Sequence, residues 1–321
     1  MIVGLNVAIS DLGSEVLSTV SSLKANATIR RCVLLFATVL VTPFCFFRRV
    51  DFLSATSSVA VIIYSIFLLD LMLAYAVPKV LSKHFSLEYF RFWRPEGLVR
   101  CVPIIASSLC CQVQVSTIYT SLKNPPLVIM KKVLIHALSF IFIYYSVAGL
   151  MGYIAFYHGL NETLPGDMLA SYPEDHRAVH IRLGFLYTVA ASLPLLLFPL
   201  RTALHSLLFE EAVVEEGPLH ADASPTIPNM RFCWLTGGVI FLSVVASQTT
   251  DKVEVILTYT GGFAGGASCY LLPALIGARA VGGGSDGRRR QLARKLIIHL
   301  LYFLGAMVLL SPALTFLGVD T

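Results

Sequence analysis

The sequence predicts an all-α protein that crosses a membrane several times. Of its 321 residues, 56% are hydrophobic and 13% are charged, whereas soluble domains average about 45–50% apolar and about 25% charged residues. The mean hydropathy is +0.75, and the apolar runs of about 17–28 residues suit helices that cross a hydrocarbon core of about 30 Å. These runs lack the alternation of apolar and polar residues that a membrane barrel requires.

Charge and cysteine usage exclude other common classes. The net charge is +5, and the basic cluster at residues 288–295 is more typical of a cytoplasmic loop than of a nucleic-acid-binding surface. The seven cysteines fall within predicted spans or at the start of one, so neither a disulfide framework nor a metal site is expected. We therefore expect a lipid bilayer, and no nucleic acid, as the protein's surroundings.

The N-terminal residues predict a partial helix and then the first complete span. Residues 1–12 are apolar but too short to cross a bilayer, and they lack the features of a signal peptide. We interpret them as the remnant of a transmembrane helix that ends at Asp11-Leu12-Gly13. A single membrane domain is then expected over residues 13–318, with its first complete span at residues 31–47.

The second predicted span, residues 52–77, contains a carboxylate. Asp70 lies in its apolar part, and ionisable residues inside spans are rare and usually functional. Two roles are open for Asp70: a proton-coupling site, or a structural acid that is neutral or paired. Pro78 is expected to end this helix, and residues 79–100 mix basic and aromatic side chains as an amphipathic helix at the headgroup level does.

The next stretch, residues 101–126, is long enough to cross the bilayer but polar in its middle. Polar groups in hydrocarbon are costly unless they find partners, so such a span usually faces a cavity or a neighbouring helix. The polar residues are Ser107, Ser108, Gln112, Gln114, Ser116 and Thr117. They indicate either a binding site or interhelical hydrogen bonds, which contribute about 0.6 kcal/mol each.

The remaining sequence predicts five more spans, which makes about eight complete spans in all. Between two of them, residues 210–229 are acidic and proline-rich, as in a flexible cytoplasmic loop. A run of four glycines at residues 261–266 predicts close helix packing. The five spans are expected at residues 127–157, from 181 onward, 232–247, 253–278 and 296–317.

Two glycosylation sequons orient the chain. They begin at Asn26 and Asn161, lie in predicted loops and are separated by four predicted spans, so they fall on the same side of the membrane. Placing that side outside puts the basic cluster at residues 288–295 in the cytoplasm, as the positive-inside rule prefers. We expect a multi-pass glycoprotein of the plasma membrane or an endolysosomal membrane, and the oligomeric state is open.

Three strings carry a resemblance to a known family: SSLCCQVQVSTIYTSLKNP at residues 107–125, RLGFLYTVAASLPLLLFPLRTALHSLLF at 182–209, and LTYTGGFAGGASCYLLPAL at 257–275. In this order they resemble the amino acid/auxin permease family, and within it the sodium-coupled neutral amino acid transporters. The similarity covers nearly the whole chain. It implies a leucine-transporter-like inverted-repeat bundle that moves neutral amino acids by symport.

The resemblance also implies the site residues. In that fold the first and sixth helices unwind at mid-membrane, and their freed backbone groups bind substrate and cation. The stretch at residues 101–126 is similar to the sixth helix, so residues 107–111 would be unwound. The implied substrate-binding residues are Ser107, Ser108, Cys111, Gln112 and Gln114. The implied ligands of a coupling Na⁺ are Thr188 and Ser192, although Ala190 stands where many members carry a hydroxyl; H⁺ is the alternative coupling ion.

The resemblance implies a fold that begins with two helices and most of a third upstream of these 321 residues, and we expect about 75 further residues to encode them. The first unwound helix is among them, so the resemblance implies an incomplete bundle. Two functions are therefore weighed: secondary active transport, and a truncated, non-transporting amino-acid sensor or partner subunit. An enzyme is not expected, because Ser285 lies in a basic loop without a base and Asp70 has no partner aspartate in another span.

Overall fold

The computed structural model of the chain describes residues 1–21, 27–46, 51–82, 98–121, 127–156, 168–172, 175–209, 227–248, 256, 258–281 and 288–316. The regular elements within these ranges are all helical, and seven helical segments are long and apolar enough to cross a membrane. The chain is thus an all-α, multi-pass membrane protein, as the sequence predicts. The contacts divide it into a first unit (Met1, residues 92–118 and 252–321) and a second unit (residues 2–91 and 119–251).

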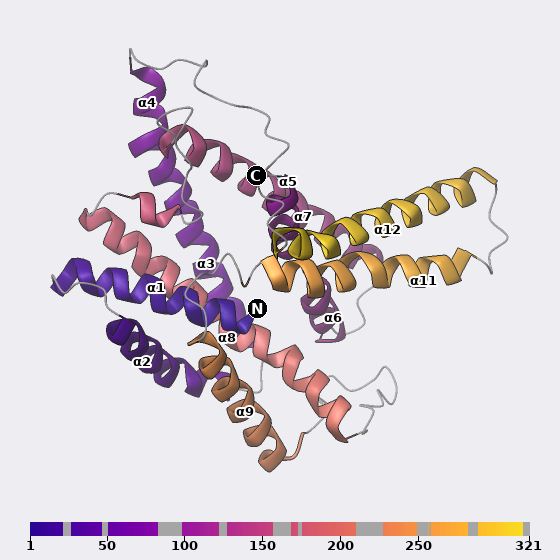
Figure 1. Cartoon of the computed structure of the whole chain (residues 1–321), viewed down its shortest axis with the longest axis horizontal. Coiled ribbons are helices and arrows are strands. Elements are labelled where there is room, and N and C mark those ends of the chain that lie inside the picture. The colour runs from indigo at the N-terminus through magenta and orange to yellow at the C-terminus, as the bar shows by residue number, and fades with distance from the viewer. Residues whose placement is uncertain are drawn as a thin grey trace. The chain divides into compact units, whose positions relative to one another are not determined.

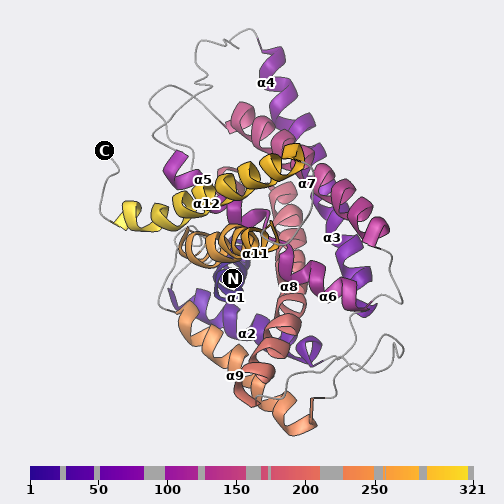
Figure 2. The ribbon, with the colours of Figure 1, turned by 90° about the vertical axis from the view of Figure 1, so that its right-hand side faces the viewer.

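The second unit is organised around one long helix. Helix α8 (His176–Phe209) packs against α1 (Ile2–Ser21), α2 (Ala27–Cys45), α3 (Asp51–Asp70) and α9 (Asn229–Ser247), and Figures 1 and 2 both show α2 and α9 beside it. The remaining elements of this unit are the π-helical η1 (Leu71–Ala76), α4 (Val77–Leu81), α7 (Leu127–Phe156) and the short 3₁₀ turn η4 (Leu169–Ser171).

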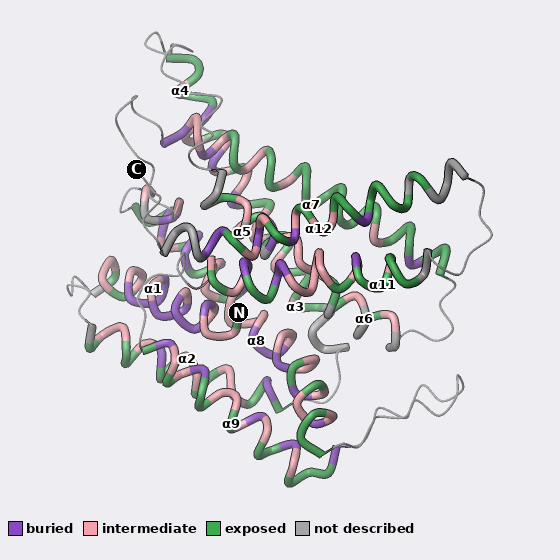
Figure 3. Tube along the Cα trace, turned by 45° about the vertical axis from the view of Figure 1, so that its right-hand side comes forward, coloured by how far each residue is buried: buried purple, intermediate pink, exposed green. Residues whose placement is uncertain are grey.

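Burial in the second unit is concentrated at helix contacts. One core cluster joins α1, α3, η1, α7 and α8, and its aromatic members include Phe67, Phe156 and Tyr172. Helix α7, in contrast, has only four buried residues among 30, and Figure 3 shows it exposed along most of its length. A helix that is apolar all round yet little buried has the surface expected of a lipid-facing span.

The first unit contains a broken helix and a glycine-rich one. Helices α5 (Leu98–Ser108) and α6 (Gln112–Ser121) follow each other closely, and the π-helical η5 (Thr260–Leu271) continues into α11 (Leu272–Val281). Helix α12 (Arg288–Phe316) packs against η5, α5 and α11. A Cβ on Gly262 would lie 2.1 Å from Pro312 Cγ, and one on Gly266 would lie 3.1 Å from Leu309 Cγ. The glycine run therefore serves close helix packing, as predicted.

Two predicted helix ends are wrong. Helix α1 continues through Asp11-Leu12-Gly13 to Ser21, because Gly13 is a contact residue and not a cap: a Cβ there would lie 2.5 Å from Val33 Cγ1 on α2. Pro78 does not close its helix either, since it occupies the first turn of α4, where a missing N–H costs little. The π-helical segment η1 leads directly into α4, and the Val77 N–H donates to the Met72 carbonyl.

The seven span-length helices correspond to seven of the eight predicted spans. The eighth, at residues 101–126, is formed by the two shorter helices α5 and α6. Several predictions lie outside the described residues: both sequon asparagines, Asn26 and Asn161, residues 83–97 of the expected headgroup-level helix, and residues 210–226 of the expected cytoplasmic loop.

Candidate functional site

The most distinctive feature of the first unit is the interruption between α5 and α6 at residues 109–111. The last regular bond of α5 runs from the Leu109 N–H to the Ile105 carbonyl at 3.1 Å, and bonding restarts with the Val115 N–H on the Cys111 carbonyl at 2.9 Å. The sequence predicts unwinding over residues 107–111. The structure confines it to 109–111, with Ser107 and Ser108 in the last turn of α5.

An interruption of this kind creates two opposed half-helix ends. The first turn of α6 presents N–H groups without intrahelical acceptors, and the last turn of α5 presents carbonyls without intrahelical donors. The helix dipoles make the first end partly positive and the second partly negative. Such a pair of ends is complementary to a zwitterion, whose carboxylate suits the N–H end and whose ammonium suits the carbonyl end.

A group of polar side chains joins this interruption to the glycine-rich helix η5. Gln112 Oε1 accepts hydrogen bonds from the Cys110 thiol at 3.3 Å and from the Cys269 thiol of η5 at 3.2 Å. The Ser268 hydroxyl lies 3.9 Å from the Cys110 sulfur and 3.8 Å from the Cys269 sulfur. We call these four residues, Cys110, Gln112, Ser268 and Cys269, the thiol cluster.

Of the five residues that the sequence predicts to bind substrate, only Gln112 belongs to the thiol cluster. Ser108 donates its hydroxyl hydrogen to the Ile104 carbonyl at 2.8 Å. Gln114 is exposed and Cys111 is half-buried. The Ser107 side chain is not among those that the structure describes. Sequence reasoning missed Ser268 and Cys269. Their positions directly after the glycine run could have indicated close approach to another helix, but not which helix.

The two predicted cation ligands lie on α8 in the second unit. Thr188 is 1% exposed and donates its hydroxyl to the Phe185 carbonyl at 2.8 Å, and Ser192 donates to the Thr188 carbonyl at 2.8 Å. These bonds use the hydroxyl hydrogens, so each oxygen keeps lone pairs that can accept a further bond or ligate a cation.

Asp70 ends α3, directly before the π-helical η1. Its Oδ2 atom and the hydroxyl of Tyr172 are both buried, and neither meets a partner at hydrogen-bonding geometry among the described residues. Burial, and after it the Asp70 carboxylate, raises the pKa of Tyr172. Short π-helical segments often occur at functional sites. Both roles that the sequence leaves open for Asp70 fit this geometry.

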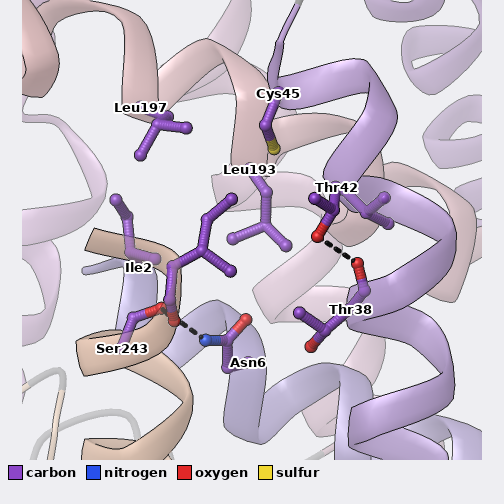
Figure 4. Close-up of a pocket in the computed structure, with 10 residues that line it drawn as sticks. Ile2, Asn6, Thr38, Thr42, Cys45, Leu193, Leu197 and Ser243 are labelled. Carbon is purple, nitrogen blue, oxygen red and sulfur yellow. Dashed lines mark hydrogen bonds between the residues drawn. The ribbon is translucent and has the colours of Figure 1, made fainter. Parts of the chain in front are cut away.

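A small cavity lies where α1, α2, α8 and α9 meet (Figure 4). Its volume is about 20 Å³, and its polar lining includes Asn6, which donates to the Ser243 hydroxyl at 3.0 Å, and Thr42, which donates to the Thr38 carbonyl at 2.7 Å. This volume suits one water molecule and is far below the roughly 300 Å³ of a small-molecule site. The cavity is therefore not a candidate for holding an amino acid.

Two buried arginines on α8 form polar contacts with neighbouring helices. The sequence alone did not identify this structural role. Arg182 is 5% exposed, and its Nε lies 3.2 Å from Glu15 Oε2 on α1. Arg201 donates to the Cys45 carbonyl at the end of α2 and to Thr236 on α9, both at 3.3 Å. Its guanidinium also lies 3.9 Å from the centre of the Phe232 ring. These contacts satisfy charges that would otherwise be buried without partners.

Comparison with known proteins agrees with the resemblance. The family model described as "Transmembrane amino acid transporter protein" matches residues 1–316. The chain is 32% identical over 277 residues to mouse solute carrier family 38 member 10, covering 85% of this chain and 25% of the relative. The human protein of that name is 31% identical, with 84% and 24% covered. Sodium-coupled neutral amino acid transporter 4 of Pongo abelii is 26% identical, with 65% and 36% covered.

The chain thus spans about a quarter of the length of the mouse and human solute carrier family 38 member 10 proteins that it matches. These relatives are named as solute carriers or transporters, a class that is not enzymatic, as the sequence predicts. No solved structure matches the chain. Because the family model covers nearly all of its residues, the chain belongs to the transmembrane amino acid transporter family.

Proposed function

We propose that the chain takes part in secondary active transport of neutral amino acids, with the substrate bound at the interruption between α5 and α6. The observation that carries this proposal is the interruption itself, which divides the predicted span at residues 101–126 into two half-helices. Opposed half-helix ends supply backbone groups for both charges of an amino acid without any charged side chain.

The neutrality of the surrounding side chains supports the proposed substrate class. The thiol cluster offers thiols, a hydroxyl and a carboxamide, all uncharged in their ordinary states. A charged substrate side chain would need an opposite charge in such a site, whereas a neutral one would not. The uncharged side chains therefore favour neutral amino acids as the substrate class.

For the coupling ion we propose Na⁺, held in part by Thr188 and Ser192. Their hydroxyl oxygens lie one turn apart on α8, and a hard cation prefers such oxygen ligands. Replacing Ser192 by Ala removes one ligand, so sodium should stimulate uptake less in this variant than in the parent. An unchanged sodium response would remove Ser192 from the site.

Uptake into proteoliposomes tests the proposal. The chain would be reconstituted with labelled glutamine, alanine or leucine outside, and sodium would be replaced by choline in a parallel series. We expect saturable uptake that falls when sodium is replaced. A variant in which residues 109–111 are all alanine should lose uptake, because a continuous helix presents no half-helix ends.

Equilibrium binding separates the two functions that the sequence leaves open. Amino-acid binding without uptake would favour the sensor or partner function over transport. If a correctly folded chain shows neither binding nor uptake, that result would contradict a substrate site at this interruption.

A further inference from the structure

The thiol cluster contains two cysteines that are far apart in the sequence and share one hydrogen-bond acceptor. Cys110 lies in the interruption and Cys269 in η5, and both thiols donate to Gln112 Oε1, at 3.3 and 3.2 Å. A single carboxamide oxygen has two lone pairs, which allows it to hold two donors side by side. The Ser268 hydroxyl also lies within 3.9 Å of both sulfurs.

The backbone on one side of the pair is not part of a regular helix. Cys110 lies outside regular helix, between the end of α5 and the start of α6, so a shift of its Cα breaks no bond of a helix interior. On the other side, η5 packs directly against α5 and α12, and Gly266 allows the approach of α12. A disulfide requires Cα atoms about 4.4–6.8 Å apart, and the movement needed to reach this spacing would fall on the interruption.

From this arrangement we propose that Cys110 and Cys269 form a modification site, at which a peroxide converts the two thiols into an intramolecular disulfide. One cysteine, as thiolate, attacks the peroxide O–O bond to give a sulfenic acid and hydroxide. The sulfur of the second cysteine then attacks the sulfenic sulfur, the S–S bond forms, and hydroxide leaves. In total, two thiols lose two electrons and two protons, and hydrogen peroxide is reduced to two waters.

The disulfide would change the interruption in two ways. It removes both donors from Gln112 Oε1, and it covalently fixes residue 110 to η5. Binding at the half-helix ends requires these ends to keep their spacing, so the cross-linked chain is expected to lose substrate binding. The cross-link itself does not depend on the proposed function, whereas its effect on uptake does.

The test uses the full chain in proteoliposomes and hydrogen peroxide as the oxidant. After oxidation, free thiols are alkylated, the chain is digested, and the peptides are identified by mass spectrometry. We expect a peptide pair joined through Cys110 and Cys269, lighter by two hydrogens than the separate peptides and split by dithiothreitol. The sequence supplies a matched control, since Cys111 is the direct neighbour of Cys110 and has no described contact with η5.

The Cys111→Ser variant should keep the cross-link, and Cys110→Ser and Cys269→Ser should each abolish it. A cross-link through Cys111 in the parent chain, or sulfenic acids that remain unpaired at both positions, would overturn the proposal. If the parent transports amino acids, peroxide should abolish uptake and dithiothreitol should restore it. If the cross-link forms and uptake does not change, the modification site is confirmed but its proposed effect on the substrate site is wrong. This outcome would not contradict the proposed transport function.

Discussion

Arg182 and Glu15 form an ion pair between α8 and α1, with 3.2 Å between Arg182 Nε and Glu15 Oε2. The arginine also donates from Nη2 to the Leu169 carbonyl at 3.2 Å. One side chain therefore joins α8, α1 and the η4 turn. Since Arg182 is 5% exposed, these contacts compensate the cost of burying its positive charge.

Removing one member of this pair should destabilise the second unit. In Arg182→Met, the partly buried Glu15 carboxylate loses this ion pair, and we expect a decrease in the free energy of unfolding of about 2 kcal/mol, below the about 3–5 kcal/mol of a fully buried pair. Thermal unfolding in detergent, followed by tryptophan fluorescence, measures the change. In the double variant Glu15→Gln/Arg182→Met, part of the loss should be recovered. If the losses of Glu15→Gln and Arg182→Met instead add up in the double variant, the pair is not coupled.

Close packing of η5 against α12 should make Gly262 intolerant of a side chain. A Cβ there would lie 2.1 Å from Pro312 Cγ and 3.3 Å from the Val308 carbonyl oxygen. Overpacking of this kind costs about 1–3 kcal/mol, so Gly262→Ala should lower the apparent melting temperature. Gly238 on α9 is the control, because a Cβ there meets nothing within 4 Å. Gly238→Ala should be neutral or slightly stabilising.

The two glutamines of α6 should differ in their importance. Both side chains are exposed, but Gln112 accepts two hydrogen bonds in the thiol cluster, to which Gln114 does not belong. Gln112→Leu removes the shared acceptor and should lower amino-acid uptake by about tenfold, the effect of about 1.4 kcal/mol. Gln114→Leu should have a smaller effect. Membrane insertion of both variants would be checked by immunoblot, and equal uptake would contradict a special role for Gln112.

Alkaline pH should destabilise the second unit through Tyr172. Burial and the nearby Asp70 raise the pKa of Tyr172 above its ordinary value of 10. The folded state then holds the phenol proton more tightly than the unfolded state, so this contribution to stability is complete below pH 10 and is lost as the pH rises above it. Melting temperatures measured between pH 9 and 11 should fall less steeply in Tyr172→Phe. Identical slopes would indicate that Tyr172 ionises equally in both states.

The sequence-based orientation can be tested by glycosylation. Expressed in a eukaryotic cell, the chain should carry glycans at Asn26 and Asn161, and each change to Gln should lower the apparent mass on a gel. Treatment with an amidase that removes N-linked glycans should bring all variants to one mass. If neither change shifts the band, the side assigned to the two sequons is wrong.

The sequence by itself determined the class of the protein and the location of its most unusual stretch. Apolar runs of span length follow from the absence of water in the hydrocarbon core, because backbone groups there must pair within a helix. That constraint acts on each segment separately, so the seven span-length helices could be predicted one by one. Because polar groups are costly in the hydrocarbon core, the polar middle of residues 101–126 could also be recognised from the sequence. The interruption at residues 109–111 lies inside this stretch.

Contacts between helices were decided only by the tertiary structure. Asp11-Leu12-Gly13 has the composition of a helix end, yet Gly13 continues α1 because it gives room to Val33 of α2. Likewise, nothing local to Gln112 identifies Cys269, 157 positions away, as the second donor to its side-chain oxygen. Helical periodicity gives the face on which a residue lies, but the partner depends on how distant helices pack, and that is a property of the whole fold.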